Sequence, residues 1–138
     1  MPNYVMNVVR MEGIASLPLF TEDESKNFYF NKLSTELSGE NQLRFTTAWC
    51  PPESVIAALA KRYPHAYIEH WWANEDMGSN SGYARYTNGE VQETFYYENG
   101  SSDEYETYTF CWGESPCLYQ DKDGIWHRKD CGECCGCD

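Results

Sequence analysis

The chain has 138 residues, a mass of 16.0 kDa and a formal net charge of −12 at pH 7. This length favours one domain with a single hydrophobic core. No run approaches the roughly 18 to 20 apolar residues that cross a bilayer, and the first residues lack the basic start and apolar run of a secretory signal. We therefore expect a soluble cytoplasmic protein that has no membrane partner.

The acidic charge is concentrated in the second half of the chain. Residues 1–73 carry 8 acidic and 6 basic side chains, whereas residues 74–138 carry 14 acidic and 4 basic ones. Nucleic-acid binding needs Lys and Arg to displace counterions from phosphates. This balance argues against direct binding of DNA or RNA and favours a basic protein partner or a metal cation.

The first half of the chain contains three predicted strands. Residues 4–11 are β-branched and apolar and predict the first strand. Residues 14–25 hold a proline and an acidic run without helical periodicity, so we expect a connection there. Further strands are predicted at 28–30 and 43–49, with a turn at 38–41 between them.

A helix is predicted from about residue 52 to residue 63. Proline is tolerated in the first turn of a helix, and Glu53 suits the positive end of the helix dipole. Val55, Ile56 and Leu59 then recur at helical spacing on one face. A helix of this length fits across one face of a sheet.

The second half is predicted to form a meander of strands. Residues 65–72 alternate, so that Trp72 and Trp71 lie on opposite faces. Residues 83–86 and 91–97 are joined by Asn88-Gly89, a two-residue hairpin signal. One more strand is expected within 105–112, and the fold class is α+β with a mostly antiparallel sheet of four to six strands.

Several motifs lie at the start of the chain and around the predicted helix. They are Met1-Pro2-Asn3 with Asn7, then Trp49-Cys50-Pro51-Pro52, Leu59, Tyr63-Pro64, Trp71-Trp72, Glu75-Asp76, Gly78 and Gly82-Tyr83. This set resembles the YubB-like family of phage- and plasmid-encoded proteins of unknown function with a ferredoxin-like C-terminal domain. The similarity covers about residues 1–12 and 42–97, and it implies a ferredoxin-like sheet and an origin in a mobile element. It implies no activity. We expect a domain over residues 1–110 and a cysteine-rich tail or zinc knuckle over 111–138.

Six of the seven cysteines follow residue 110, which in a cytoplasmic chain favours metal ligation over a disulfide framework. The spacing Cys-x2-Cys supplies two thiolates as tetrahedral zinc prefers them. We expect a structural zinc ion, with disulfides and free thiols as the alternatives. The expected ligands are Cys111, Cys117, Cys131 and Cys134, with His127, Cys135 or Cys137 as substitutes.

Catalytic signatures are weak in this sequence. His70, Glu75 and Asp76 could form an acid–base or metal site, but a half-buried strand histidine and a hydrogen-bonded turn explain them more simply. The sequence contains no nucleophile elbow, phosphate loop or H-E-x-x-H motif. We therefore expect no enzyme activity.

Carboxylates and tyrosines alternate through the second half and predict an acidic surface with aromatic anchors. Such a surface could be an ordinary solvated face, or it could mimic a nucleic-acid backbone toward a basic protein. Its expected partner-binding residues are Glu90, Glu93, Glu98, Asp103, Glu104, Glu106, Tyr96 and Tyr97. An alternative ligand pocket would be formed by Trp71, Trp72, Tyr83 and Tyr86.

The sequence therefore favours a small, non-enzymatic phage or mobile-element protein that binds and inhibits a basic host protein, such as a CRISPR effector or another nucleoprotein, in the host bacterial cytoplasm. A second hypothesis is a sponge for a nucleotide-like signal, held by stacking in the aromatic pocket. The others are an accessory phage protein without an inhibitory role and a metal-dependent enzyme or redox protein that uses His70 or the tail.

Overall fold

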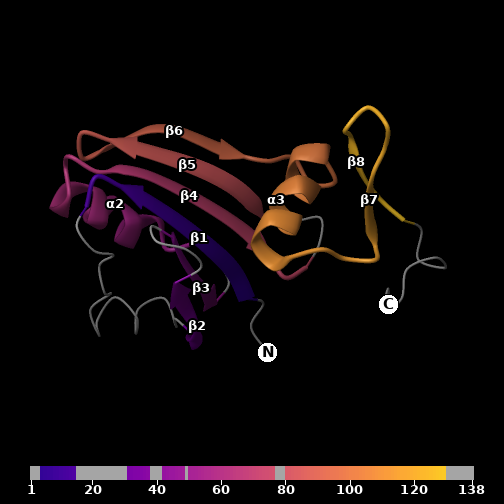
Figure 1. The fold of residues 1–138 in the computed structure, drawn as a ribbon, viewed down its shortest axis with the longest axis horizontal. Helices are drawn as coiled ribbons and strands as arrows, with labels where there is room; N and C mark the ends of the chain where they lie inside the picture. The colour runs from indigo at the N-terminus through magenta and orange to yellow at the C-terminus, as the bar shows by residue number, and fades with distance from the viewer. Residues whose placement is uncertain (1–3, 15–30, 38–41, 49, 77–79, 130–138) are drawn as a thin grey trace.

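The computed structural model describes residues 4–14, 31–37, 42–48, 50–76 and 80–129 (Figure 1). Eight strands and two helices are described within these ranges. They are β1 (Tyr4–Glu12), β2 (Asn31–Leu37), β3 (Gln42–Ala48), α2 (Glu53–Arg62), β4 (Tyr67–Asn74), β5 (Ser81–Thr87), β6 (Glu90–Tyr96), α3 (Ser102–Trp112), β7 (Leu118–Gln120) and β8 (Trp126–Arg128).

Six of the strands form one sheet in the order β2-β3-β1-β4-β5-β6, and every neighbouring pair is antiparallel. The first four strands have the order of a ferredoxin-like fold, in which a strand–helix–strand unit is split by an inserted strand. The β5–β6 hairpin extends this sheet beyond β4. The expected ferredoxin-like α+β fold is confirmed.

Helix α2 covers one face of the sheet, as its apolar spacing predicts. Val55, Ile56 and Leu59 are buried, and Ile56 and Leu59 belong to a core that contains Phe45 and Trp72. Glu53 lies in the first turn of the helix, and Lys61 and Arg62 lie in the last, which complements the helix dipole. The main hydrophobic core therefore lies between α2 and the sheet.

Helix α3 packs on the opposite face of the sheet, over β1 and β4. Cys111 is fully buried with Met6 and Val8, and Trp112 donates from its indole Nε1 to the carbonyl oxygen of Ala73 at 2.8 Å. Arg44 donates to the carbonyl oxygens of Phe110 and Cys111 at the C-terminal end of α3, where cations are stabilised.

The strand expected within 105–112 is wrong, because these residues belong to α3. A capping arrangement explains the difference. The Ser101 hydroxyl accepts from the backbone N–H of Glu104, and the Glu104 carboxylate accepts from the backbone N–H of Gly100, which supplies partners for N–H groups at the helix start. The expected boundary after residue 110 falls inside α3.

Some of the remaining predicted elements can be compared with the structure, and others lie outside the described residues. The Asn88-Gly89 hairpin is confirmed, since both residues adopt the positive φ that this turn requires. Strand β2 and the β7–β8 hairpin were not predicted from sequence. The expected strand at 28–30, the turn at 38–41 and nearly all of the connection at 14–25 lie outside the described residues.

Gly82 marks a close approach between β5 and the core. A Cβ atom at this position would overlap the Trp72 ring and the carbonyl oxygen of Phe95. Trp72 is fully buried on the α2 face, so its ring has little room to move away. A glycine is therefore required here for the tryptophan to fill the core.

Candidate functional site

The four residues of the expected aromatic pocket lie on opposite faces of the sheet. Trp71 and Tyr83 are register partners on the face that α3 partly covers, with ring centroids 5.3 Å apart. Trp72 and Tyr86 are buried on the α2 face. These four side chains therefore do not form one ligand pocket, because neighbouring strand residues point to opposite sides.

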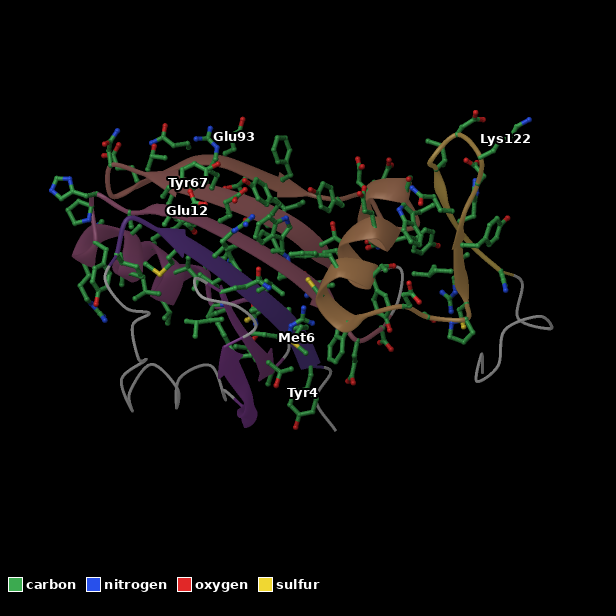
Figure 2. The ribbon with its side chains drawn as sticks, viewed as in Figure 1. Tyr4, Met6, Glu12, Tyr67, Glu93 and Lys122 are labelled. Carbon is green, nitrogen blue, oxygen red and sulfur yellow. The ribbon has the colours of Figure 1, made fainter. Side chains whose placement is uncertain are left out.

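The expected acidic surface is also divided by the fold. Glu90, Glu93 and Tyr96 lie on β6, whereas Asp103 and Glu106 lie on α3. Glu98 is exposed in the segment between β6 and α3, and Figure 2 shows Glu93 along the outer edge of the sheet.

Glu104 is not a surface residue, contrary to expectation. Its side chain is fully buried, one carboxylate oxygen accepts from Gly100, and the other has no hydrogen-bond partner in the described part of the chain. Burial raises the pKa of its carboxyl group. Glu104 thus caps the helix and is unavailable to a partner protein.

A pocket beside α3 brings Trp71 of the expected ligand pocket together with Tyr97, Asp103 and Glu106 of the expected partner-binding set. It has a volume of about 370 Å³ and lies between α3 and the open side of the sheet. Trp71, Tyr97 and Phe110 contribute aromatic rings to its lining, and Asp103 and Glu106 contribute carboxylates. Of these five, only Phe110 was not expected to bind a partner or ligand.

Each element places its side chains in this pocket for a simple geometric reason. The helical residues of the lining share one face of α3, because they follow Asp103 by three, four and seven positions. They are Glu106, Thr107 and Phe110. Tyr97 immediately follows β6 and is held by a hydrogen bond from its backbone N–H to the carbonyl oxygen of Ser81 at 3.0 Å. The helical spacing is the sequence signal that would have found Thr107 and Phe110.

The aromatic part of the site continues across the open face of the sheet. Phe110 meets Trp71 edge-on, with ring centroids 4.9 Å apart. Tyr83 stands between Trp71 and Phe95, whose ring lies 6.4 Å from that of Tyr83. The Tyr83 hydroxyl donates to the Glu69 carboxylate at 2.7 Å, so this row of rings is held in place at its centre.

The pocket is electrostatically negative. Asp103 and Glu106 are exposed and form no ion pair with any described residue. Burial and the nearby Asp103 and Glu106 carboxylates raise the pKa of Tyr97. Aromatic faces attract cations, and carboxylates form charge-assisted hydrogen bonds with them. The arrangement can therefore bind an ammonium or guanidinium group, and it would repel a phosphate.

The structure separates the three residues of the candidate acid–base site. His70 is fully buried inside the sheet, where its Nε2 lies 2.8 Å from Asn7 Oδ1. Glu75 and Asp76 are exposed after β4, and Glu75 accepts from the backbone N–H of Tyr4. Burial lowers the pKa of His70 to about 3, so the imidazole is neutral near pH 7 and out of reach of a substrate in solvent.

The described tail cysteines have different chemical states. Cys111 is a free, buried thiol, and burial raises its pKa to about 12, whereas Cys117 is disulfide-bonded. Cys131, Cys134, Cys135 and Cys137 lie outside the described residues. No group of three or more potential ligands is found in the described ranges. Zinc binding by the tail therefore stays a prediction.

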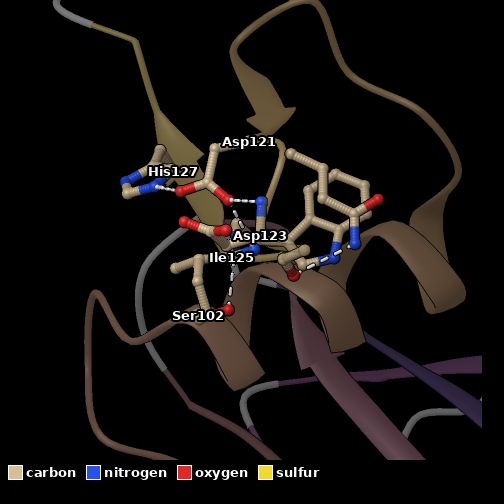
Figure 3. Close-up of polar contacts among 8 residues, drawn as sticks. Ser102, Asp121, Asp123, Ile125 and His127 are labelled. Carbon is tan, nitrogen blue, oxygen red and sulfur yellow. Dashed lines mark hydrogen bonds and ion pairs between the residues drawn. The ribbon is translucent and has the colours of Figure 1, made fainter.

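The substitute ligand His127 already has a partner in the β7–β8 hairpin (Figure 3). Its Nε2 lies 2.7 Å from Asp121 Oδ2, while Asp121 Oδ1 accepts from the backbone N–H groups of Asp123 and Ile125. These bonds lower the pKa of Asp121. Ser102 accepts from the N–H of Trp126 and ties the hairpin to α3, so the cluster has a structural explanation.

Comparisons with known proteins agree with the fold. A family model described as the ferredoxin-like domain in Api92-like protein matches residues 27–111, and the chain belongs to this family. The Uncharacterized protein YubB of Escherichia coli (strain K12) is 42% identical over 64 residues, which cover 44% of this chain and 42% of YubB. The chain therefore matches less than half of that relative's length.

No solved structure matches this chain. Among the helices of the described residues, none combines the length and the apolar composition that a membrane span requires.

Proposed function

We propose that this chain is a small, non-enzymatic protein of a phage or other mobile element that binds a basic host protein and inhibits it. The class of target we favour is a bacterial defence or nucleic-acid-processing protein, such as a CRISPR effector. The observation that supports this proposal best is the pocket in which Trp71, Tyr97 and Phe110 stand beside the carboxylates of Asp103 and Glu106, which form no ion pair with a described residue.

The pocket matches a basic partner in two independent ways. A Lys or Arg side chain entering it gains cation–π contact with the rings and a charge-assisted hydrogen bond with a carboxylate. Around it, the chain carries a net charge of −12, which accelerates encounter with a positively charged protein. Proteins that bind nucleic acids expose such basic surfaces, and an acidic protein can compete for them.

A nucleotide sponge is a weaker second candidate. The row formed by Phe110, Trp71, Tyr83 and Phe95 offers stacking surface for a base. However, Asp103 and Glu106 stand where this row meets α3, and they would repel the phosphates of a nucleotide signal.

The test compares a pocket variant with a charge-matched control. Asp103→Asn combined with Glu106→Gln removes both pocket carboxylates at nearly constant shape. Glu114→Gln combined with Asp123→Asn removes the same charge from exposed positions outside the pocket. Each form is immobilised, and proteins retained from a bacterial lysate are identified at about 0.05 M and 0.5 M salt, where screening differs strongly.

We expect wild type and the control to retain the same basic protein at low salt, and the pocket variant to lose it. The protein forms are then expressed in bacteria carrying the corresponding defence system, and phage plaques are counted. Equal retention and equal plaque numbers for the pocket variant and the wild type would contradict the proposal. Retention without any effect on plaques would indicate an accessory binding protein instead of an inhibitor.

A further inference from the structure

Strand β6 ends the sheet with an open backbone edge. In the described residues, β6 pairs with β5 alone, and its pairing is regular from Glu93 to Tyr96. Tyr97 donates its backbone N–H to Ser81 on β5. Because backbone groups alternate in direction along a strand, the N–H and C=O groups of Tyr96 and Thr94 point away from β5.

The side chains of this edge strand are unusually apolar for an exposed position. Val91, Phe95 and Tyr96 are 53%, 49% and 68% exposed, and all residues of β6 are exposed. Soluble proteins protect free edges with charges, prolines or bulges. Here the register shift between Arg85 and Tyr86 affects only the half of β6 near the hairpin turn, so the half from Glu93 onward stays open.

A groove runs beside the edge on the α2 face. It has a volume of about 600 Å³, and its lining includes Ala57, Tyr86, Val91 and Tyr96. The Tyr96 hydroxyl donates to Glu53 on α2 at 2.7 Å, so this ring bridges the strand and the helix. On the opposite face, Phe95 continues the aromatic row toward Tyr83.

We propose that the β6 edge accepts an extended segment of a basic partner protein as a seventh strand of the sheet. Main-chain hydrogen bonds to Thr94 and Tyr96 would hold the segment, and its alternate side chains would fall on the two faces of the sheet. Apolar residues would then lie over the groove beside Tyr96. Side chains on the other face would lie near the Arg85–Glu93 ion pair, and a basic one would share the Glu93 carboxylate with Arg85.

Charge decides between a basic segment and a second copy of the chain. Two copies would each bring a net charge of −12, and antiparallel pairing of β6 with itself in the register centred on Glu93 would place this carboxylate opposite its own counterpart. Like charges placed opposite each other on neighbouring strands are destabilising. A basic segment would instead be attracted by the net charge of the chain and by Glu90, because Glu93 is already paired with Arg85 at 3.2 Å. The inference rests on the proposed function for the charge of the partner, but its surface does not include Asp103 or Glu106.

The experiment measures the affinity of short peptides for the full chain by isothermal titration. The first probe alternates valine and lysine. The second has the same sequence with N-methyl groups on all of its backbone nitrogens, which removes the hydrogen-bond donors of both edges and leaves the side chains intact. We expect the first peptide to bind at least about tenfold more tightly than the second, because the second cannot extend the ladder.

Two variants of the chain separate this edge from the pocket. Thr94→Pro removes an outward N–H without breaking a bond to β5, since proline is tolerated on edge strands, and should weaken the valine–lysine peptide at least about tenfold. Circular dichroism and urea unfolding check that this variant folds. The comparison of the two peptides uses the wild-type chain and therefore tests the inference even if the variant does not fold. Asp103→Asn with Glu106→Gln should bind the peptide as wild type does, so failure of the pocket does not affect this result.

Three results would overturn the inference. The first is that neither peptide binds, and the second is that the N-methylated peptide binds as tightly as the unmodified one. The third is that sedimentation shows a dimer of the chain that Thr94→Pro abolishes, since the edge would then be occupied by a second copy.

Discussion

The buried His70 should make the stability of this protein fall steeply on mild acidification. Asn7 donates its amide N–H to Thr47 Oγ1 at 3.0 Å, so its Oδ1 accepts and His70 Nε2 carries the proton. Nδ1 is then an acceptor with no partner in the described structure. Protonating it would create a buried cation whose Nδ1–H has no partner among the described residues, and this burial is why the pKa falls to about 3.

The magnitude follows from proton linkage. The pKa is about 3 in the folded state and near its ordinary value of 6.5 in the unfolded state. Between these values the unfolded state holds one more proton, so the contribution of His70 to the free energy of unfolding decreases by about 1.4 kcal/mol per pH unit below pH 6.5. Between pH 7 and pH 4 this amounts to about 3 kcal/mol.

The assay is urea unfolding followed by tryptophan fluorescence at several pH values between 7 and 4. Wild type is compared with His70→Gln, which cannot take up the proton, and with His65→Gln, a matched change at an exposed position. From pH 7 to pH 4, the free energy of unfolding of the wild type should fall by about 3 kcal/mol more than that of His70→Gln. His65→Gln should follow the wild type. Parallel profiles for all three proteins would refute the reasoning.

Three further predictions concern packing and the tail. Leu59→Ala should lower the free energy of unfolding by about 2 to 5 kcal/mol, because this α2 side chain is fully buried between the helix and the sheet; a loss below about 0.5 kcal/mol would contradict that packing. Gly82→Ala should cost about 1 to 3 kcal/mol by overpacking against Trp72 and Phe95, and unchanged urea unfolding would show that the ring moves aside freely. Elemental analysis of protein purified without added metal should find one zinc ion per chain if the four expected cysteines are ligands; absence of metal together with tail cysteines that do not react with a thiol reagent would favour disulfides, as at Cys117.

The fold was predictable wherever short-range patterns decide local structure. The helical spacing of Val55, Ile56 and Leu59 predicted α2, because only a helix buries these positions together. Asn88-Gly89 predicted the β5–β6 hairpin, since both residues accept positive φ. These signals act over a few residues and do not depend on the rest of the chain.

Helix α3 shows where this reasoning reaches its limit. Aromatic and β-branched residues within 105–112 suggested a strand, but the cap formed by Ser101 and Glu104 starts a helix there. The S-x-x-E pattern was readable in the sequence. What settles the matter is tertiary, because the helix buries Cys111 against Met6 and Val8 of β1, and packing outweighs weak intrinsic propensities.

The candidate site depended on the tertiary structure more than the fold did. Sequence determined that the chain is strongly acidic and that Trp71 and Trp72 would face opposite sides of a strand. Only the placement of α3 over β4 decided that Trp71, Asp103 and Phe110 line one pocket and that Glu104 is buried. The reason is that contacts between residues more than thirty positions apart depend on how the helix and the sheet pack, and no local spacing encodes that packing.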